Sequence, residues 1–144
     1  MENKCYTPIE LFGVECGNGW KDLLTPIIDY VNEYNKDKKE EEKIEFIQIK
    51  EKYGGLRVYT NFGTKELFDL IEKAEEESYD VCEDCGTREN VGFKTNGWLR
   101  TLCLDCAKNE AKTLHSTVKW ERNSDKKMFN INVDGTTTEI EKQN

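Results

Sequence analysis

The sequence predicts an α+β fold made of a small helix–hairpin–helix layer, a four-cysteine module and a C-terminal β-hairpin. Apolar residues recur at helical spacing in two stretches of the first 80 residues, and two strand-like stretches lie between them on either side of a Gly-Gly turn. Two Cys-x-x-Cys pairs follow. We therefore expect an α+β domain over residues 1–80, a cysteine module over 81–114 and a β-hairpin extension over 115–144.

The composition is that of a small and highly charged chain. Of its 144 residues, 36% are hydrophobic and 35% are charged, which fits one domain or a small domain with an added module. The net charge of -8 repels a phosphate backbone, so we do not expect general binding to duplex DNA. There is no apolar stretch of about 18 residues and no apolar leader-like segment after Met1, so we expect a cytoplasmic chain without membrane contact.

The first helix is predicted from Trp20 onward. Gly17-Asn18-Gly19 is a turn signal in which Asn18 is a candidate N-cap. Pro26 interrupts the helical pattern, so the helix is either kinked there or begins again with Thr25 as N-cap and Pro26 as its first residue. The apolar residues on one helical face are Trp20, Leu23, Leu24, Ile27, Ile28, Val31 and Tyr34.

A β-hairpin and a second helix follow a charged connection over residues 35–43. Ile44–Lys52 and Leu56–Phe62 are rich in β-branched and aromatic residues, and Tyr53-Gly54-Gly55 makes the turn between them. Thr64 is a candidate N-cap for a helix from Lys65 to about Tyr79. The apolar stripe of that helix is Leu67, Leu70, Ile71 and Ala74.

Four cysteines form two pairs, Cys82 with Cys85 and Cys103 with Cys106. The 17 residues between the pairs fall within the spacing of four-cysteine zinc sites. Two disulfides or a redox Cys-x-x-Cys are the alternatives, but no thioredoxin-like βαβ pattern surrounds either pair, and a cytosolic chain favours metal thiolates. Four protein ligands leave no position for water, so we expect a structural Zn²⁺. Gly86, after the first pair, fits a turn that needs positive φ.

The elements around the cysteines resemble a treble-clef zinc fold. Val91–Thr95 and Trp98–Leu102 are predicted to form a hairpin around Asn96-Gly97, because both turn residues accept positive φ. Residues 107–114 have good helix propensity, so the second cysteine pair would lie at a helix N-terminus, where the dipole stabilises thiolate charge. A zinc ribbon is the alternative.

Residues 115–144 contain three strand-like segments. These are Val118–Trp120, Met128–Val133 and Thr136–Ile140. Asp134-Gly135 between the last two is a hairpin signal. These strands could extend a sheet.

A positively charged turn is the first candidate binding site. Three basic side chains surround the Gly-Gly turn in an otherwise acidic chain. Glycines let a ligand approach the backbone, and free amides beside Lys and Arg suit an anion such as a phosphate. The alternative is an ordinary hairpin turn with solvated lysines and an arginine paired to carboxylates. The candidate ligand-binding residues are Lys50, Lys52, Tyr53, Gly54, Gly55 and Arg57.

A second candidate site lies on the hairpin between the cysteine pairs. Trp98 follows Asn96-Gly97, and Lys94 and Arg100 flank it, so the indole ring could stack on a base with Arg100 beside the ligand. Alternatively, Trp98 covers the core of the cysteine module, and the two basic side chains offset the charge of a four-thiolate zinc centre. Whether the two basic hairpins form one site stays open at this point.

Signals for catalysis are few. His115 is the one histidine and lies outside both candidate sites, which favours a role at a helix end. Cys5 and Cys16 have no histidine nearby in sequence, and we interpret them as reduced, partly buried thiols. No metalloprotease, serine-hydrolase or P-loop motif occurs. We therefore do not expect an enzyme.

One further signal is the order of motifs along the chain: Gly17-Asn-Gly-Trp20, Gln48-Ile-Lys-Glu-Lys-Tyr-Gly-Gly-Leu-Arg57, Cys82-x-x-Cys85-Gly86, Gly97-Trp98 and Cys103-x-x-Cys106. In this order the chain resembles a group of small zinc-binding proteins encoded by phages and prophages. The resemblance covers roughly residues 15–107 and is most specific in the Lys50–Arg57 string. It implies a viral or mobile-element origin and action in the cytoplasm of a bacterial host, and it brings no activity with it.

These observations favour a non-enzymatic binding protein that captures a nucleotide-like anionic small molecule at the Lys50–Arg57 turn, in a counter-defence setting. A zinc module that binds nucleic acid or acts in transcription is the first alternative, because basic residues on one hairpin could reach phosphates despite the net charge. An acidic inhibitor that covers a basic site on a host protein is the second. A homo-oligomer is compatible with each.

Overall fold

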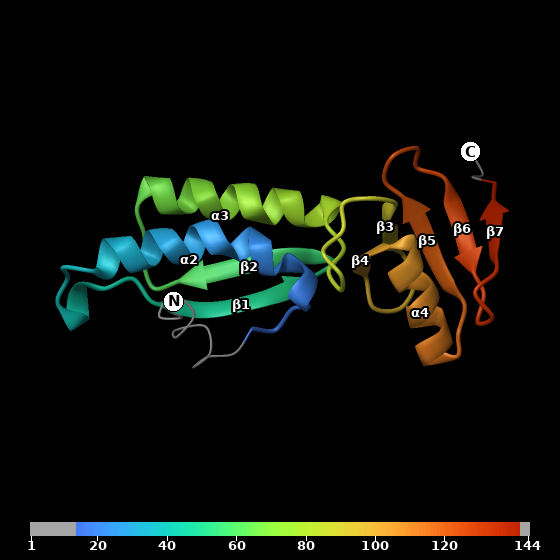
Figure 1. Ribbon diagram of the computed structural model, residues 1–144, viewed down its shortest axis with the longest axis horizontal. Helices are drawn as coiled ribbons and strands as arrows, with labels where there is room; N and C mark the ends of the chain where they lie inside the picture. The colour runs from blue at the N-terminus through green and yellow to red at the C-terminus, as the bar shows by residue number, and fades with distance from the viewer. Residues whose placement is uncertain (1–13, 142–144) are drawn as a thin grey trace.

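The computed structural model describes residues 14–141, which form two lobes joined end to end (Figure 1). This part of the chain has three α-helices and two antiparallel sheets, so the expected α+β class is confirmed. The first lobe carries helices α2 (Lys21–Asn35) and α3 (Lys65–Glu77) on one side of a sheet made of β1 (Phe46–Lys52) and β2 (Gly55–Thr60). None of the helices within this range is long and apolar enough to cross a lipid bilayer.

Helix α2 continues through Pro26. The proline removes the hydrogen bond that residue 26 would donate to the Asp22 carbonyl, but apolar residues on both sides of it are buried in one core, so the helix does not begin again at Thr25. A 3₁₀ turn over Asn18–Trp20 precedes the helix and has no side-chain cap. The prediction that Asn18 is an N-cap is therefore wrong, because Asn18 is already the first residue of this turn.

Tyr53 and Gly54 form a two-residue turn between β1 and β2. Their φ angles of 53° and 84°, with Lys52 paired to Gly55, identify a type I′ turn. Gly55 is therefore the first residue of β2, whereas the sequence placed it in the turn. The core of the first lobe lies between this sheet and the two helices and includes Trp20, Ile27, Ile49, Leu56, Val58 and Leu67.

Both edges of the two-stranded sheet are covered. Glu15 pairs with the edge of β1 through two backbone hydrogen bonds of 2.8 and 3.0 Å. At the edge of β2, the Ser78 hydroxyl accepts a hydrogen bond from the Leu56 amide, and the Glu75 carboxylate accepts one from the Val58 amide, each at 3.0 Å. These contacts satisfy amides that would otherwise be open to edge-to-edge pairing.

Helix α3 follows the prediction closely. The Thr64 hydroxyl accepts a hydrogen bond from the Leu67 amide at 3.1 Å, so Thr64 is the N-cap. The helix ends at Glu77 and is followed by a 3₁₀ turn over Ser78–Asp80, close to the expected end at Tyr79.

The second lobe packs one helix against a five-stranded sheet. Its elements are β3 (Val91–Lys94), β4 (Arg100–Cys103), α4 (Leu104–Leu114), β5 (Val118–Arg122), β6 (Met128–Ile131) and β7 (Thr137–Ile140). The strand order is β4-β3-β5-β6-β7, and the expected hairpin of β6 and β7 forms. Because β5 pairs with β3, the C-terminal strands and the cysteine module share one sheet. The core of this lobe includes Cys82, Val91, Leu102, Ala107, Trp120 and Ile131.

The loop between β3 and β4 is longer than the predicted Asn-Gly turn. Strand pairing ends at Lys94 opposite Arg100, which leaves residues 95–99 in the loop. The Asn96 side chain donates a hydrogen bond to the Thr117 carbonyl at 3.0 Å and accepts one from the Lys119 amide at 2.8 Å. Asn96 therefore extends the contact with β5 instead of closing a tight turn.

Candidate metal centre and adjoining groove

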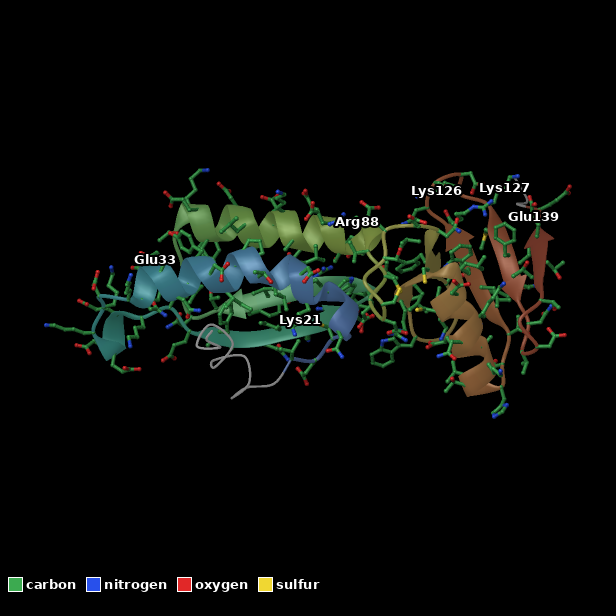
Figure 2. All side chains as sticks on the ribbon, viewed as in Figure 1. Lys21, Glu33, Arg88, Lys126, Lys127 and Glu139 are labelled. Atoms are coloured by element: carbon green, nitrogen blue, oxygen red, sulfur yellow. The ribbon has the colours of Figure 1, made fainter. Side chains whose placement is uncertain are left out.

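A group of sulfur atoms lies where the two lobes meet (Figure 2). The four Sγ atoms of the Cys-x-x-Cys pairs lie within 4.8 Å of one another, and those of Cys85 and Cys103 are 3.7 Å apart. Four thiolates at about 2.3 Å from a tetrahedral Zn²⁺ would be about 3.8 Å apart. The donor set of Cys82, Cys85, Cys103 and Cys106 therefore fits a single four-coordinate metal ion. The five cysteines within residues 14–141 are free, so no disulfide links them.

The first cysteine pair sits on a tight turn. Gly86 has a φ of 82°, and its amide donates a hydrogen bond to the Cys82 carbonyl at 2.9 Å. The positive φ expected of Gly86 is thus confirmed. The Cys82 amide in turn donates to the Thr87 carbonyl at 2.9 Å, which closes the turn around the pair.

The second pair lies at the start of α4. The helix begins at Leu104, so Cys103 is its N-cap, and the Cys103 sulfur accepts a hydrogen bond from the Cys106 amide at 3.4 Å. The expected position at a helix N-terminus is confirmed, although the helix starts before Cys106. Free amides and the helix dipole favour thiolate charge at both sulfur atoms.

Burial opposes ionisation of these thiols to different extents. Desolvation raises the pKa of Cys103 to about 11 and raises the pKa of Cys106 further. Burial also acts against the Cys82 thiolate, but hydrogen bonds from the backbone amides of Cys103, Cys85 and Asp84 outweigh it and lower the pKa of Cys82. One thiol is thus predisposed to ionise, whereas a bound cation would supply the charge that compensates the others.

Residues 17–20, the segment before α2, form hydrogen bonds to the turn of the first cysteine pair. The Gly19 amide donates a hydrogen bond to the Glu83 carbonyl at 2.7 Å, and the Gly17 amide donates to the Glu83 carboxylate at 2.9 Å. The buried Trp20 indole N–H donates to the Val81 carbonyl at 2.8 Å. A Cβ on either glycine would lie 2.5 Å from the Glu83 carbonyl oxygen. The sequence indicated only a turn here, although glycines such as Gly17 and Gly19 also permit close backbone approach.

A network of charged side chains, most of them buried or partly buried, joins the cysteine turn to α4. Arg100 pairs with Asp84, with Glu110 at 2.8 Å and with Glu83 at 3.5 Å, and Lys94 pairs with Glu110 at 3.0 Å. Burial works against the Arg100 charge, but the three carboxylates outweigh it and raise the pKa of Arg100 above its usual value. Both basic side chains are therefore engaged by acidic neighbours within the second lobe.

Replacing Arg100 by alanine is expected to lower the free energy of unfolding of the metal-loaded protein by about 2–3 kcal/mol, because it leaves partly buried carboxylates without their partner. Urea titration followed by circular dichroism measures this change. Lys65→Ala is the matched control, since it breaks an exposed pair with Asp69 on a helix surface and should leave the midpoint nearly unchanged. Equal effects of the two substitutions would contradict the structural role of Arg100.

The tip of the β1–β2 hairpin packs against the second lobe. A Cβ on Gly54 would lie 2.3 Å from the Phe93 ring, and the Gly54 carbonyl accepts a hydrogen bond from the Thr101 hydroxyl at 2.7 Å. The Gly54 amide donates to the Glu51 carboxylate at 2.6 Å. This amide is therefore already paired within the hairpin, and the glycine serves close packing between the lobes.

Gly55 and Arg57 both contact Tyr79. A Cβ on Gly55 would lie 2.3 Å from the Tyr79 hydroxyl oxygen. The Arg57 guanidinium donates to this hydroxyl at 3.2 Å and to the Leu56 carbonyl at 2.8 Å. The hydrogen bond with Tyr79 raises the pKa of Arg57. These contacts hold β2 to the 3₁₀ turn that follows α3.

A groove of about 440 Å³ lies between the hairpin tip and the β3–β4 loop. Tyr53 and Trp98 are 68% and 70% exposed, which leaves both rings open to a ligand. The Trp98 indole N–H donates a hydrogen bond to the Glu51 carboxylate at 2.9 Å and so orients the ring. Lys52 Nζ lies 5.6 Å from the centre of the Tyr53 ring. The groove is lined by Glu51, Lys52, Tyr53, Gly97, Trp98 and Leu99.

The structure separates the predicted ligand-binding residues into three groups. Lys52, Tyr53 and Trp98 line the groove, Lys50 lies on the face of the sheet away from the helices, and Gly54, Gly55, Arg57 and Arg100 make the contacts described above. The two basic hairpins thus meet at one groove. Sequence reasoning missed Glu51 and Leu99 there. A carboxylate shortly before a glycine turn was the available signal for Glu51, and no local signal points to Leu99.

The remaining candidate residues have structural positions. His115 follows α4 with a φ of 52°, which places it at the helix end as expected. Burial raises the pKa of Cys16 to about 12, in agreement with a partly buried thiol. Cys5 lies outside the described residues.

Comparison with known proteins identifies no relative of this chain. No protein-family model matches the chain, and neither a curated protein nor a solved structure matches it. The functional argument therefore rests on the cysteine cluster and the groove.

Proposed function

We propose that the four cysteines hold a structural Zn²⁺ in a treble-clef arrangement. Four thiolates are a soft donor set that suits zinc, and four protein ligands leave no site for a reacting water. The order of first cysteine turn, β3–β4 hairpin and α4, with the second pair at the helix start, supports the treble clef over the zinc ribbon. In this proposal the ion stabilises the second lobe and takes no part in chemistry.

The protein itself is, in this proposal, a non-enzymatic binding protein that captures a nucleotide-like ligand in the groove. The observation that carries this proposal is the pair of exposed aromatic rings, Tyr53 and Trp98, held by different lobes at one groove. Aromatic rings stack on the flat face of any base, and stacking contributes about 1–3 kcal/mol per base.

The polar groups of the groove have complementary roles in this proposal. Lys52 carries a positive charge beside Tyr53 and would contact a phosphate of the stacked nucleotide. Each oxygen of the Glu51 carboxylate accepts one protein hydrogen bond and retains a lone pair for an N–H of a base. The groove therefore suits a ligand with an anionic end and a ring that carries donors, rather than a phosphate alone.

The setting that we propose is counter-defence in a phage-infected bacterium. The order of motifs supports it through its resemblance to phage and prophage proteins. Capture of a nucleotide in the host cytoplasm would lower the free concentration of that nucleotide without any chemical step. Cyclic nucleotides and nucleoside monophosphates are therefore the ligands to examine first.

Trp98→Ala is expected to weaken nucleotide binding by about 10-fold or more, since it removes one stacking surface. Isothermal calorimetry with mono-, di- and cyclic nucleotides on the zinc-loaded protein measures the effect. Phe68→Ala is the matched control, because Phe68 is an aromatic side chain on α3 that is 51% exposed and lies outside the groove. Absence of saturable binding to any of these nucleotides, or equal affinity of the Trp98 variant, would refute the proposed function.

A further inference from the structure

The face of the β1–β2 sheet that is turned away from the helices carries a distinct set of side chains. Ile49 on β1 and Leu56 and Val58 on β2 are buried beneath α2 and α3, which lie together on one side of the sheet (Figure 1). Because successive residues of a strand point to opposite faces, Lys50, Arg57 and Tyr59 lie on the other side. Among the described residues, no helix covers this open face.

Two like charges face each other on this open face. Lys50 and Arg57 are direct cross-strand partners, an arrangement that destabilises a sheet. Within residues 14–141, neither Lys50 nor Lys52 forms an ion pair, although the chain has 29 acidic residues to choose from. Two unpaired lysines on one side of an acidic protein indicate a place where an anion binds. The Arg57 guanidinium is engaged by the Tyr79 hydroxyl and the Leu56 carbonyl.

The basic side chains of the open face, Lys50, Lys52 and Arg57, form a basic strip. Aromatic side chains lie at both ends of this strip. Lys52 belongs to the strip by strand alternation and also lines the groove that holds Tyr53 and Trp98. Tyr59, 42% exposed, lies beyond Arg57 at the other end. The order along the face is therefore aromatic groove, basic strip and aromatic ring.

We propose that the groove and the open face together bind single-stranded nucleic acid, with the groove holding one terminal base. This inference rests on the proposed function, because it extends the same stacking site. Basic side chains two residues apart on a strand are separated by about 6.7 Å, so Lys52 and Lys50 can contact successive phosphates of an extended strand. A second base then stacks on Tyr59. A mononucleotide in the groove would leave Lys50 without an anion.

Competition against a fluorescently labelled hexanucleotide tests this inference on the zinc-loaded protein. Unlabelled mono-, di- and tetranucleotides of deoxythymidine and of uridine are the competitors, and a duplex of the same length as the hexanucleotide is the comparison. We expect the tetranucleotide to bind about 10-fold or more tighter than the mononucleotide. Its affinity should fall with salt at a slope of about -1.4, as the two phosphates neutralised by Lys52 and Lys50 imply for a single strand. Comparison of the deoxythymidine and uridine competitors shows whether the protein prefers single-stranded DNA or single-stranded RNA.

Variants on the open face separate this inference from the proposed function. Lys50→Ala and Tyr59→Ala should each weaken the tetranucleotide about 5-fold or more and leave mononucleotide affinity unchanged. Lys73→Ala, which removes an exposed lysine from α3, should change neither affinity. Equal affinity for mono- and tetranucleotides would overturn the inference and leave the proposed function standing. Equal affinity for the duplex would also overturn the inference. No binding of these ligands, together with no binding of the mono-, di- and cyclic nucleotides in the calorimetry described above, would overturn both proposals.

Discussion

Removal of the metal by a chelator is expected to unfold residues 82–114. Zn²⁺ in small four-ligand modules contributes about 10–16 kcal/mol of apparent free energy, which is more than the core of a small lobe supplies. Cys82 and Cys103 are buried in the same apolar cluster as Trp120, so the strands of the C-terminal sheet should lose their packing as well. The far-ultraviolet circular dichroism signal should report this loss, and so should the tryptophan fluorescence, to which the buried Trp120 contributes.

The first lobe supplies an internal comparison for the chelation experiment. Its core is a separate cluster of buried residues under α2 and α3, so amide hydrogens of those helices should stay more protected than those of α4 after chelation. Cys85→Ser should reproduce the effect of the chelator, whereas Cys16→Ser, outside the cluster, should not. An unchanged fold after chelation, or a purified protein without metal, would disprove the metal centre.

Gly19→Ala is expected to lower the free energy of unfolding by about 3 kcal/mol, at the upper end of the range for overpacking. The new Cβ would lie 2.2 Å from the Cys82 carbonyl oxygen and 2.5 Å from that of Glu83. Both neighbours are backbone atoms, which cannot rotate away as a flexible side chain can. The contact between the N-terminal segment and the first cysteine pair must therefore separate.

Urea titration of the zinc-loaded variants measures this effect. Gly135→Ala is the control, because Gly135 has a φ of 91° but no atom near its missing Cβ, so the substitution costs only the left-handed backbone strain of about 1–2 kcal/mol. Trp98→Ala in the same titration shows whether a change in the groove alone affects stability. If Gly19→Ala were no more destabilising than Gly135→Ala, the close contact at Gly19 would not exist in solution.

Features with local causes could be predicted from the sequence. The Thr64 cap depends on an amide three residues away, and the turn at Gly86 depends on its own φ. The spacing of the two cysteine pairs can be read directly in the sequence, so the cluster of four sulfur atoms was predictable as well.

Features whose causes lie far along the chain could not be predicted in this way. Gly54 looked like a place for a ligand to approach, but the atoms that approach it belong to Phe93 and Thr101. In the same way, the sequence favoured Arg57 as an anion-binding side chain, but its guanidinium donates a hydrogen bond to the Tyr79 hydroxyl. A glycine in the sequence indicates that another group can approach the backbone closely, but only the folded structure identifies that group. The long β3–β4 loop has a similar origin in the distant partner of Asn96.

The close contacts between the lobes also limit how the molecule can be divided. A fragment that ends at residue 80 would lose the partners of Gly54 and Trp20, and a fragment that begins at residue 81 would lose those of Glu83 and Phe93. Each half would present to water a surface that is shaped to fit the other. Truncation would thus confuse loss of a binding site with loss of solubility, and single substitutions in the full chain are the sound way to assign its parts.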